Sequence, residues 1–224
     1  MFVPDARLDQ PLQEQIETTL GNKSVFFVQI GSNDGIQGDP LHDLIIKHAD
    51  WQGIFVEPVK YVFERLKRNY ANSTRFVFEN VAIGKENGRA QFYHVAERTT
   101  NGVREQLPYW YDQLGSFDRG HILRHLDGKL EPYIIEEEIK CISLPALLER
   151  NNVAAIDLLH VDAEGFDYEV IAQFPFERFR PYLILFEHKH LTADEKEKAR
   201  RVLTARGYNL FEINGDTLAK LNGE

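Results

Sequence analysis

Short apolar runs alternate along this chain with segments in which apolar residues repeat at helical spacing. The runs predict strands at residues 25–30, 53–57, 75–83, 156–161 and 182–186. Continuous apolar runs are typical of parallel strands buried on both faces, and helices between them are typical of crossover connections. The pattern therefore predicts an α/β protein with a mostly parallel sheet and helices on both faces.

The C-terminal part predicts a different strand arrangement. Residues 192–206 have the spacing of a helix with a charged face, and residues 208–213 and 217–221 read as strands. The turn Asn214-Gly215-Asp216 between them is typical of a hairpin. We therefore expect the final strand to run antiparallel to its neighbours. Shorter strands are expected at residues 90–94 and 139–142.

Residues 96–138 interrupt the alternation and are too long for an ordinary connection. They mix aromatic residues with hydrogen-bonding side chains, which suits recognition of a hydroxylated ligand. We predict a single domain over residues 1–224, with a lid or substrate-recognition insertion at about 96–138. The run Tyr109-Trp110-Tyr111 is expected to form part of the pocket wall. The alternative is a peripheral subdomain whose aromatic residues pack on the sheet.

Composition narrows the class of protein. A net charge of -9 and 43% hydrophobic residues fit one soluble α/β domain and disfavour a nucleic-acid substrate. The single cysteine, Cys141, excludes an intramolecular disulfide. No apolar run approaches the length of a membrane span, so we expect no stable membrane insertion and a cytoplasmic location. The residues do not indicate an oligomeric state.

A glycine turn and a distant carboxylate indicate a cofactor site. The first predicted strand ends in Gly31-Ser32-Asn33-Asp34-Gly35, and the second ends at Glu57. Glycine at a strand exit leaves room for a ligand across the turn. An acidic residue roughly 20 positions further on, at the end of the next strand, is where doubly wound folds bind a ribose diol. The turn lacks the second near glycine that a dinucleotide pyrophosphate requires.

Three segments of the chain resemble the FkbM family of S-adenosylmethionine-dependent methyltransferases. They are residues 28–35, Phe55-Val56-Glu57-Pro58 and residues 156–171, which contain Asp162-Ala163-Glu164-Gly165. The last is the most specific, although the family often has lysine where this chain has His160. The resemblance covers roughly residues 26–190. It implies a Rossmann-like class I methyltransferase fold with a mostly parallel seven-stranded sheet and an antiparallel final strand.

The resemblance also implies S-adenosyl-L-methionine as cofactor. Glu57 is expected to bind the ribose of the cofactor. Asn33 and the glycine turn are expected to bind its methionine end, and Asn80 is expected to border the adenine. The motif Leu114-Gly115-Ser116 is similar to one in the family, so Ser116 is expected near the cofactor. The full set of expected cofactor-binding residues is Gly31, Ser32, Asn33, Asp34, Gly35, Glu57, Pro58, Asn80, Val81, Ala82, Ser116 and Asp162.

Candidate catalytic residues follow the fourth and fifth strands, at the edge where open α/β sheets bind ligands. They are Asp162, His188 and His160, with His190 as a further base. Asp162, Glu187 and His188 also resemble the metal ligands of catechol-type O-methyltransferases. Two accounts stay open. A divalent ion (Mg, Mn or Zn) acidifies the acceptor hydroxyl, or one of these residues removes its proton directly.

The sequence thus predicts O-methylation of a small hydroxylated acceptor, such as a sugar, a polyketide or a lipid-linked molecule. Two alternatives remain: a non-catalytic S-adenosylmethionine-binding or sensor protein, and an enzyme that uses another nucleotide cofactor. The histidine and carboxylate residues at the ends of the fourth and fifth strands favour an enzyme.

Overall fold

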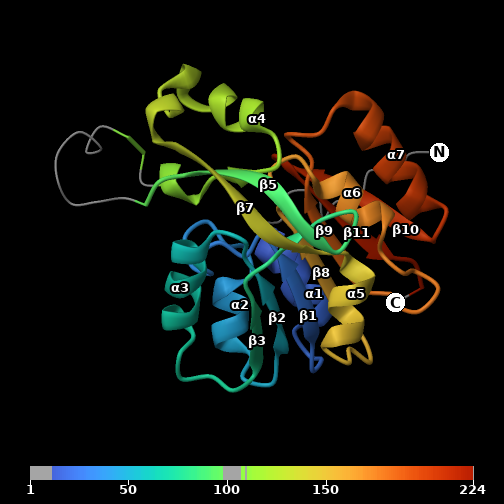
Figure 1. Cartoon of the computed structure of the whole chain (residues 1–224). Coiled ribbons are helices and arrows are strands. Elements are labelled where there is room, and N and C mark those ends of the chain that lie inside the picture. The colour runs from blue at the N-terminus through green and yellow to red at the C-terminus, as the bar shows by residue number, and fades with distance from the viewer. Residues whose placement is uncertain (1–11, 98–106, 109, 224) are drawn as a thin grey trace.

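A mostly parallel seven-stranded sheet forms the centre of the computed structural model, which describes residues 12–97, 107–108 and 110–223 (Figure 1). In spatial order its strands are β10 (Tyr208–Ile213), β11 (Asp216–Leu221), β9 (Leu183–Glu187), β8 (Leu158–Val161), β1 (Phe26–Ile30), β2 (Gln52–Val56) and β3 (Phe76–Glu79). The strand β11 runs antiparallel to β10 and β9 on its two sides, and the other strand pairs of the sheet are parallel. The sheet and its antiparallel final strand confirm the predicted fold.

The parallel register brings three strand ends together. Ile30, the last residue of β1, pairs with Val56 of β2 on one side and with Val161 of β8 on the other. The residues that follow these strands therefore emerge at one edge of the sheet. This carboxyl edge is where the candidate cofactor and catalytic residues were expected.

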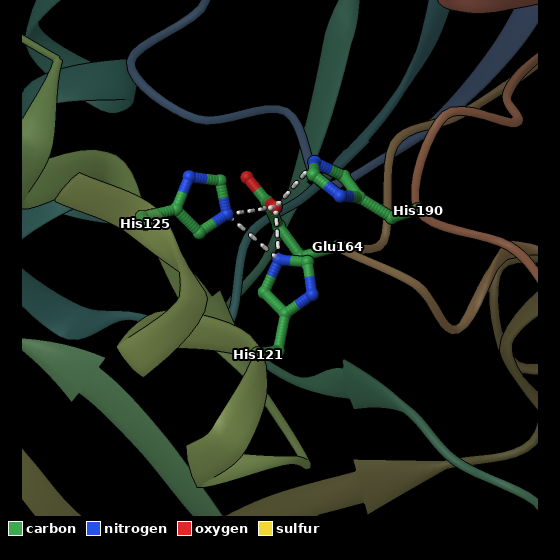
Figure 2. A group of neighbouring side chains, drawn as sticks. All are labelled: His121, His125, Glu164 and His190. Atoms are coloured by element: carbon green, nitrogen blue, oxygen red, sulfur yellow. Dashed lines mark hydrogen bonds and ion pairs between the residues drawn. The ribbon is translucent and has the colours of Figure 1, made fainter. Parts of the chain in front are cut away.

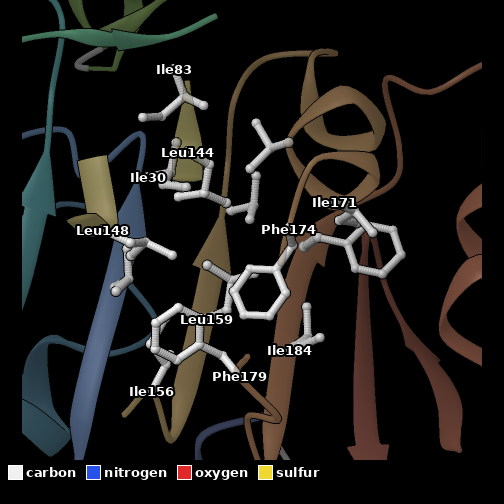
Figure 3. Close-up of a cluster of buried hydrophobic side chains, with 14 of the residues drawn as sticks. Ile30, Ile83, Leu144, Leu148, Ile156, Leu159, Ile171, Phe174, Phe179 and Ile184 are labelled. Carbon is white, nitrogen blue, oxygen red and sulfur yellow. The ribbon is translucent and has the colours of Figure 1, made fainter. Parts of the chain in front are cut away.

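Helices cover both faces of the sheet, as predicted. Their bounds are α1 (Leu12–Leu20), α2 (His42–Lys47), α3 (Lys60–Asn69), α5 (Leu144–Arg150), α6 (Asp167–Ala172) and α7 (Ala193–Thr204). Buried residues of α1, α2 and α3 pack on one face. Those of α5, α6 and α7 pack on the other, and Figure 3 shows part of that core. Within the described ranges, none of the helices has the length and apolar content needed to cross a membrane.

A second, four-stranded sheet lies beyond the carboxyl edge of the large one (Figure 1). In spatial order its strands are β4 (Ala82–Ile83), β7 (Ile134–Ile142), β5 (Gly88–Val95) and β6 (Gly115–Ser116). The chain between β5 and β7 also forms the helix α4 (Arg119–Arg124) and the 3₁₀ turns η2 (Tyr111–Gln113), η3 (His125–Gly128) and η4 (Glu131–Tyr133). A separate cluster of buried apolar residues lies under this segment.

Two strand predictions need correction. Residues 75–83 do not form one strand: β3 ends at Glu79 and β4 joins the second sheet. Asn80 turns the chain there, because its side chain donates hydrogen bonds to the carbonyl oxygens of Glu57 and Pro58. The short strand at 139–142 extends back to Ile134, so the proposed insertion ends before 138. Three consecutive exposed glutamates, residues 136–138, conceal this strand in the sequence.

Candidate active site

The turn after β1 requires glycine at its first position. Gly31 has a φ of +74°, and a Cβ built on it would lie 1.7 Å from the backbone oxygen of Asp162. The backbone N–H groups of Gly31 and Ser32 both donate to the carbonyl oxygen of Val56, at 3.0 Å each. Gly31 is therefore held between the ends of β1, β2 and β8, where a side chain has no space.

Glu57 presents a buried carboxylate beside this turn. Its side chain accepts hydrogen bonds from the backbone N–H groups of Asn33, at 3.0 Å, and Val59, at 2.8 Å. Only 6% of the residue is exposed, and burial raises the pKa of its carboxyl group to about 7. Each carboxylate oxygen takes one backbone hydrogen bond, which leaves lone pairs for the donors of a ligand.

A pocket opens between the carboxyl edge and the second sheet. Together with the open space at its mouth, it encloses about 580 Å³. Its walls combine apolar side chains with three acidic residues. The lining residues are Ile30, Gly31, Asn33, Val56, Glu57, Pro58, Val81, Ala82, Ile83, Phe92, Gln113, Gly115, Phe117, Asp162, Ala163 and Glu164.

Most of the expected cofactor-binding residues line this pocket. Those that do are Gly31, Asn33, Glu57, Pro58, Val81, Ala82 and Asp162. They come from the ends of β1, β2 and β8 and from the turn that leads into β4. The structure therefore brings together residues that are up to 131 positions apart in the sequence.

Five expected cofactor-binding residues lie outside the lining and support it instead. Ser32 donates to the carbonyl oxygen of Gln29 and accepts from Val56 N–H. The Asp34 carboxylate accepts from two backbone N–H groups in its own loop. Asn80 fixes the turn described above.

The other two are Gly35 and Ser116. Gly35 packs against α3, where an added Cβ would lie 2.6 Å from both Leu66 and Tyr70. Ser116 donates a hydrogen bond to the carbonyl oxygen of Glu164 at 3.2 Å. Both residues hold elements in place around the pocket, and neither lines it.

Several lining residues carry no signal in the sequence that assigns them to the pocket. Phe92, Gln113, Gly115 and Phe117 come from the second sheet and the segment joined to it. Their contribution depends on pairing between β5 and β6, which nothing in the local sequence specifies. In the sequence, only the motif Asp162-Ala163-Glu164-Gly165 marks Glu164.

The structure places the three candidate catalytic residues in different surroundings. Asp162 lines the pocket, whereas His160 and His188 do not. His160 is buried within β8, and burial lowers its pKa to about 4. His188 is also buried, and its Nδ1 forms a 2.9 Å hydrogen bond with Thr217 Oγ1. Asp162 is thus the one of the three that a molecule in the pocket can reach.

The predicted metal ligands Asp162, Glu187 and His188 are not brought together as a set of close donor atoms. In the described part of the chain, a group of at least three such donors forms elsewhere, at His121, His125, Glu164 and His190. The physical reason is that His188 pairs with Thr217 of the neighbouring β11. We call these four residues the His₃Glu cluster (Figure 2).

The aromatic run expected in the pocket wall is only partly described. Tyr109 lies outside the described residues. Tyr111 is fully buried and, with Trp110, packs in the small apolar cluster under the insertion. Neither lines the pocket, where Gln113, Gly115 and Phe117 are the contributions of this segment. The prediction for Trp110 and Tyr111 is therefore wrong for this pocket.

Comparison with known proteins identifies the family of this chain. The sequence profile of the methyltransferase FkbM domain matches residues 29–210. The solved structure of methyltransferase FkbM from Methylobacillus flagellatus KT has a TM-score of 0.54 at 14% identity. The alignment covers 88% of this chain and 43% of that protein, so the chain spans less than half of that protein's length.

A second solved structure is the precorrin-6y C5,15-methyltransferase from Geobacter metallireducens GS-15. It has a TM-score of 0.48 at 10% identity, and the alignment covers 97% of this chain and 91% of that protein. No curated protein matches the sequence significantly. The family profile matches most of the chain, and the matched range includes the glycine turn and Glu57. The chain therefore belongs to the FkbM methyltransferase family.

Proposed function

We propose that this protein transfers a methyl group from S-adenosylmethionine to a hydroxyl oxygen of a small molecule. The observation that carries the proposal is the pocket in which the Gly31 turn faces the buried Glu57 carboxylate. Sugars, polyketides and lipid-linked molecules are the acceptor classes that the family resemblance suggests. No described feature selects one of them.

The residues present fit this cofactor. The carboxylate of Glu57 has lone pairs for both hydroxyls of a ribose, and Gly31 lines the same pocket, where its backbone packs against that of Asp162. Val81, Ala82, Ile83 and Phe92 supply an apolar wall on which an adenine ring can pack. Asn33, which belongs to the turn, also lines the pocket and can bind a polar amino-acid moiety.

When bound, S-adenosylmethionine supplies a methyl group to the acceptor oxygen and is left as a neutral thioether, while the hydroxyl proton passes to a base. Asp162 is the residue that we assign to receive this proton, because it lines the pocket at the end of β8. The pocket walls would align the acceptor with the cofactor, and such positioning supplies much of the barrier reduction.

Replacing Glu57 by alanine should weaken binding of S-adenosylhomocysteine by about 1.5–3 kcal/mol, the scale of lost charge-assisted hydrogen bonds. Calorimetric titration of the purified protein measures this change. Glu79→Ala is a matched control, because Glu79 ends the neighbouring strand β3 and pairs with Arg150 outside the pocket. Equal affinities for wild type and Glu57→Ala would remove Glu57 from the site.

Cofactor affinity should depend on pH through Glu57. Its pKa of about 7 means that the carboxyl group is largely protonated at pH 6. Ribose hydroxyls donate to the ionised form, so affinity should fall about tenfold for each pH unit below the pKa and level off above it. Binding at pH 6 should also release a proton. Glu57→Gln should flatten this profile, and an unchanged profile in that variant would assign the dependence to another group.

Two other functions are distinguished by direct measurement. A sensor protein would bind S-adenosylhomocysteine but form no product one methylene unit heavier in extracts given labelled cofactor. An enzyme that uses a nicotinamide nucleotide would bind that nucleotide in preference to S-adenosylhomocysteine. The carboxylates in the pocket wall and the turn without a second near glycine favour methyl transfer over both.

A further inference from the structure

Three histidines and one glutamate from distant parts of the chain converge beside the pocket. His121 comes from α4 and His125 from the start of η3, Glu164 follows β8, and His190 follows β9. One donor atom from each residue lies within 4.8 Å of all the others. Figure 2 shows the three imidazole rings turned toward the same carboxylate oxygen of Glu164.

Four of the distances between donor atoms lie around the value expected for a single metal ion. His121 Nε2 lies 2.7 Å from Glu164 Oε2 and 3.2 Å from His125 Nε2. Glu164 Oε2 lies 3.7 Å from His190 Nε2 and 4.0 Å from His125 Nε2. Ligands about 2.0–2.1 Å from a tetrahedral zinc ion are roughly 3.3 Å apart, which lies in the middle of this range.

Hydrogen bonding within the protein does not account for the arrangement. The contact between His121 and Glu164 is one strong pair, but His190 Nε2 is buried and forms no hydrogen bond within the described ranges. The nearby Glu187 Oε2 has the same property and lies 3.5 Å from that nitrogen. Buried polar atoms normally have partners, so their convergence at one point indicates a ligand.

The backbone holds Glu164 in an uncommon conformation. Its φ is +49°, in the left-handed region that residues other than glycine rarely adopt. The carboxylate of Asp167 stabilises this turn by accepting hydrogen bonds from the N–H groups of Ala163 and Gly165. Leu126 and Asp127, directly after His125, also have a φ of +53°. Strain of this kind collects at functional sites, where the surrounding structure imposes it.

We propose that the His₃Glu cluster binds one divalent first-row transition-metal ion, with zinc as the best match. Imidazole ligands suit zinc and its neighbours, whereas magnesium prefers six oxygen ligands. Glu164 supplies the negative charge.

The position of this ion gives it a role in the proposed function. Glu164 also lines the cofactor pocket, so the ion would lie at the pocket wall. Zinc can expand to five ligands, and an acceptor hydroxyl bound there would lose its proton more readily. This role rests on the proposed methyl transfer, whereas metal binding itself does not.

Metal binding is tested on the full chain after treatment with a chelator. Titration with Zn²⁺ should show one site per chain, and Co²⁺ should give the intense visible absorption of a four-coordinate ion. His190→Gln should weaken Zn²⁺ binding about 100-fold or more. His48→Gln is the matched control, because His48 also contacts a glutamate, Glu17, but is not part of the His₃Glu cluster. Circular dichroism should show that both variants are folded.

Each outcome bears on one part of the inference. Wild-type protein without a stoichiometric Zn²⁺ site, or equal Zn²⁺ affinity in His190→Gln and His48→Gln, would overturn the metal site. S-adenosylhomocysteine binding to the metal-free protein is measured separately. If the protein binds Zn²⁺ but shows no S-adenosylhomocysteine binding in this separate measurement, the proposed function is contradicted and the metal site is not affected.

Discussion

Replacing Gly31 by alanine should destabilise the protein by about 2–5 kcal/mol and abolish measurable binding of S-adenosylhomocysteine. The added Cβ would overlap the backbone oxygen of Asp162, at 1.7 Å, in a turn whose φ of +74° already disfavours a side chain. Left-handed strain costs about 1–2 kcal/mol and overpacking a further 1–3 kcal/mol or so. Thermal unfolding and calorimetric titration measure the two effects.

Gly38→Ala separates backbone strain from steric overlap. Gly38 has the same φ of +74°, but no atom of the described residues would lie within 4 Å of an added Cβ there. This variant should therefore lose about 1–2 kcal/mol from strain alone and retain full cofactor affinity. If Gly31→Ala were as stable as Gly38→Ala and bound S-adenosylhomocysteine normally, the close contact between β1 and β8 would not shape the site.

Replacing Asp162 by asparagine should lower turnover by about 10²–10⁴-fold, the usual contribution of a positioned general base. Asparagine keeps the shape of the side chain but cannot take up the acceptor proton. Cofactor affinity should change only a few-fold, because Glu57 and the Gly31 turn hold the nucleoside. The measurements are the rate of labelled-methyl transfer at saturating cofactor and a parallel binding titration.

Asp157→Asn is the control for this experiment. Asp157 precedes the same strand β8 at its opposite end, where its carboxylate accepts a hydrogen bond from Phe26 N–H at 2.7 Å. The substitution should reduce stability and leave the turnover rate of the folded protein unchanged. Full turnover in Asp162→Asn would transfer the proton-accepting role to another group at the pocket.

The sequence predicted the parts of the fold that depend on local pattern. The central strands are continuous apolar runs, and the glycine turn and Glu57 mark where two of them end. Parallel pairing then brings these ends together without further information. The second sheet could not be predicted in the same way, because β7 contains three exposed glutamates and is defined by its pairing with β5.

The His₃Glu cluster could not be predicted from the sequence for a similar reason. His121 and His125 have the i, i+4 spacing of one helix face, which also suits an ordinary amphipathic segment. His190 is 26 residues beyond Glu164, and only the approach of the loops after β8 and β9 brings them together. The hydrogen bond between His188 and Thr217 has the same origin, since Thr217 lies on the antiparallel strand β11.

A crystal structure of the complex with S-adenosylhomocysteine tests the central claim most directly. We expect the nucleoside in the pocket between the Gly31 turn and the second sheet, with both ribose hydroxyls within hydrogen-bond distance of the Glu57 carboxylate. The adenine should pack against Ala82 and Phe92. A ligand bound elsewhere on the chain, or a ribose that does not contact Glu57, would contradict the account.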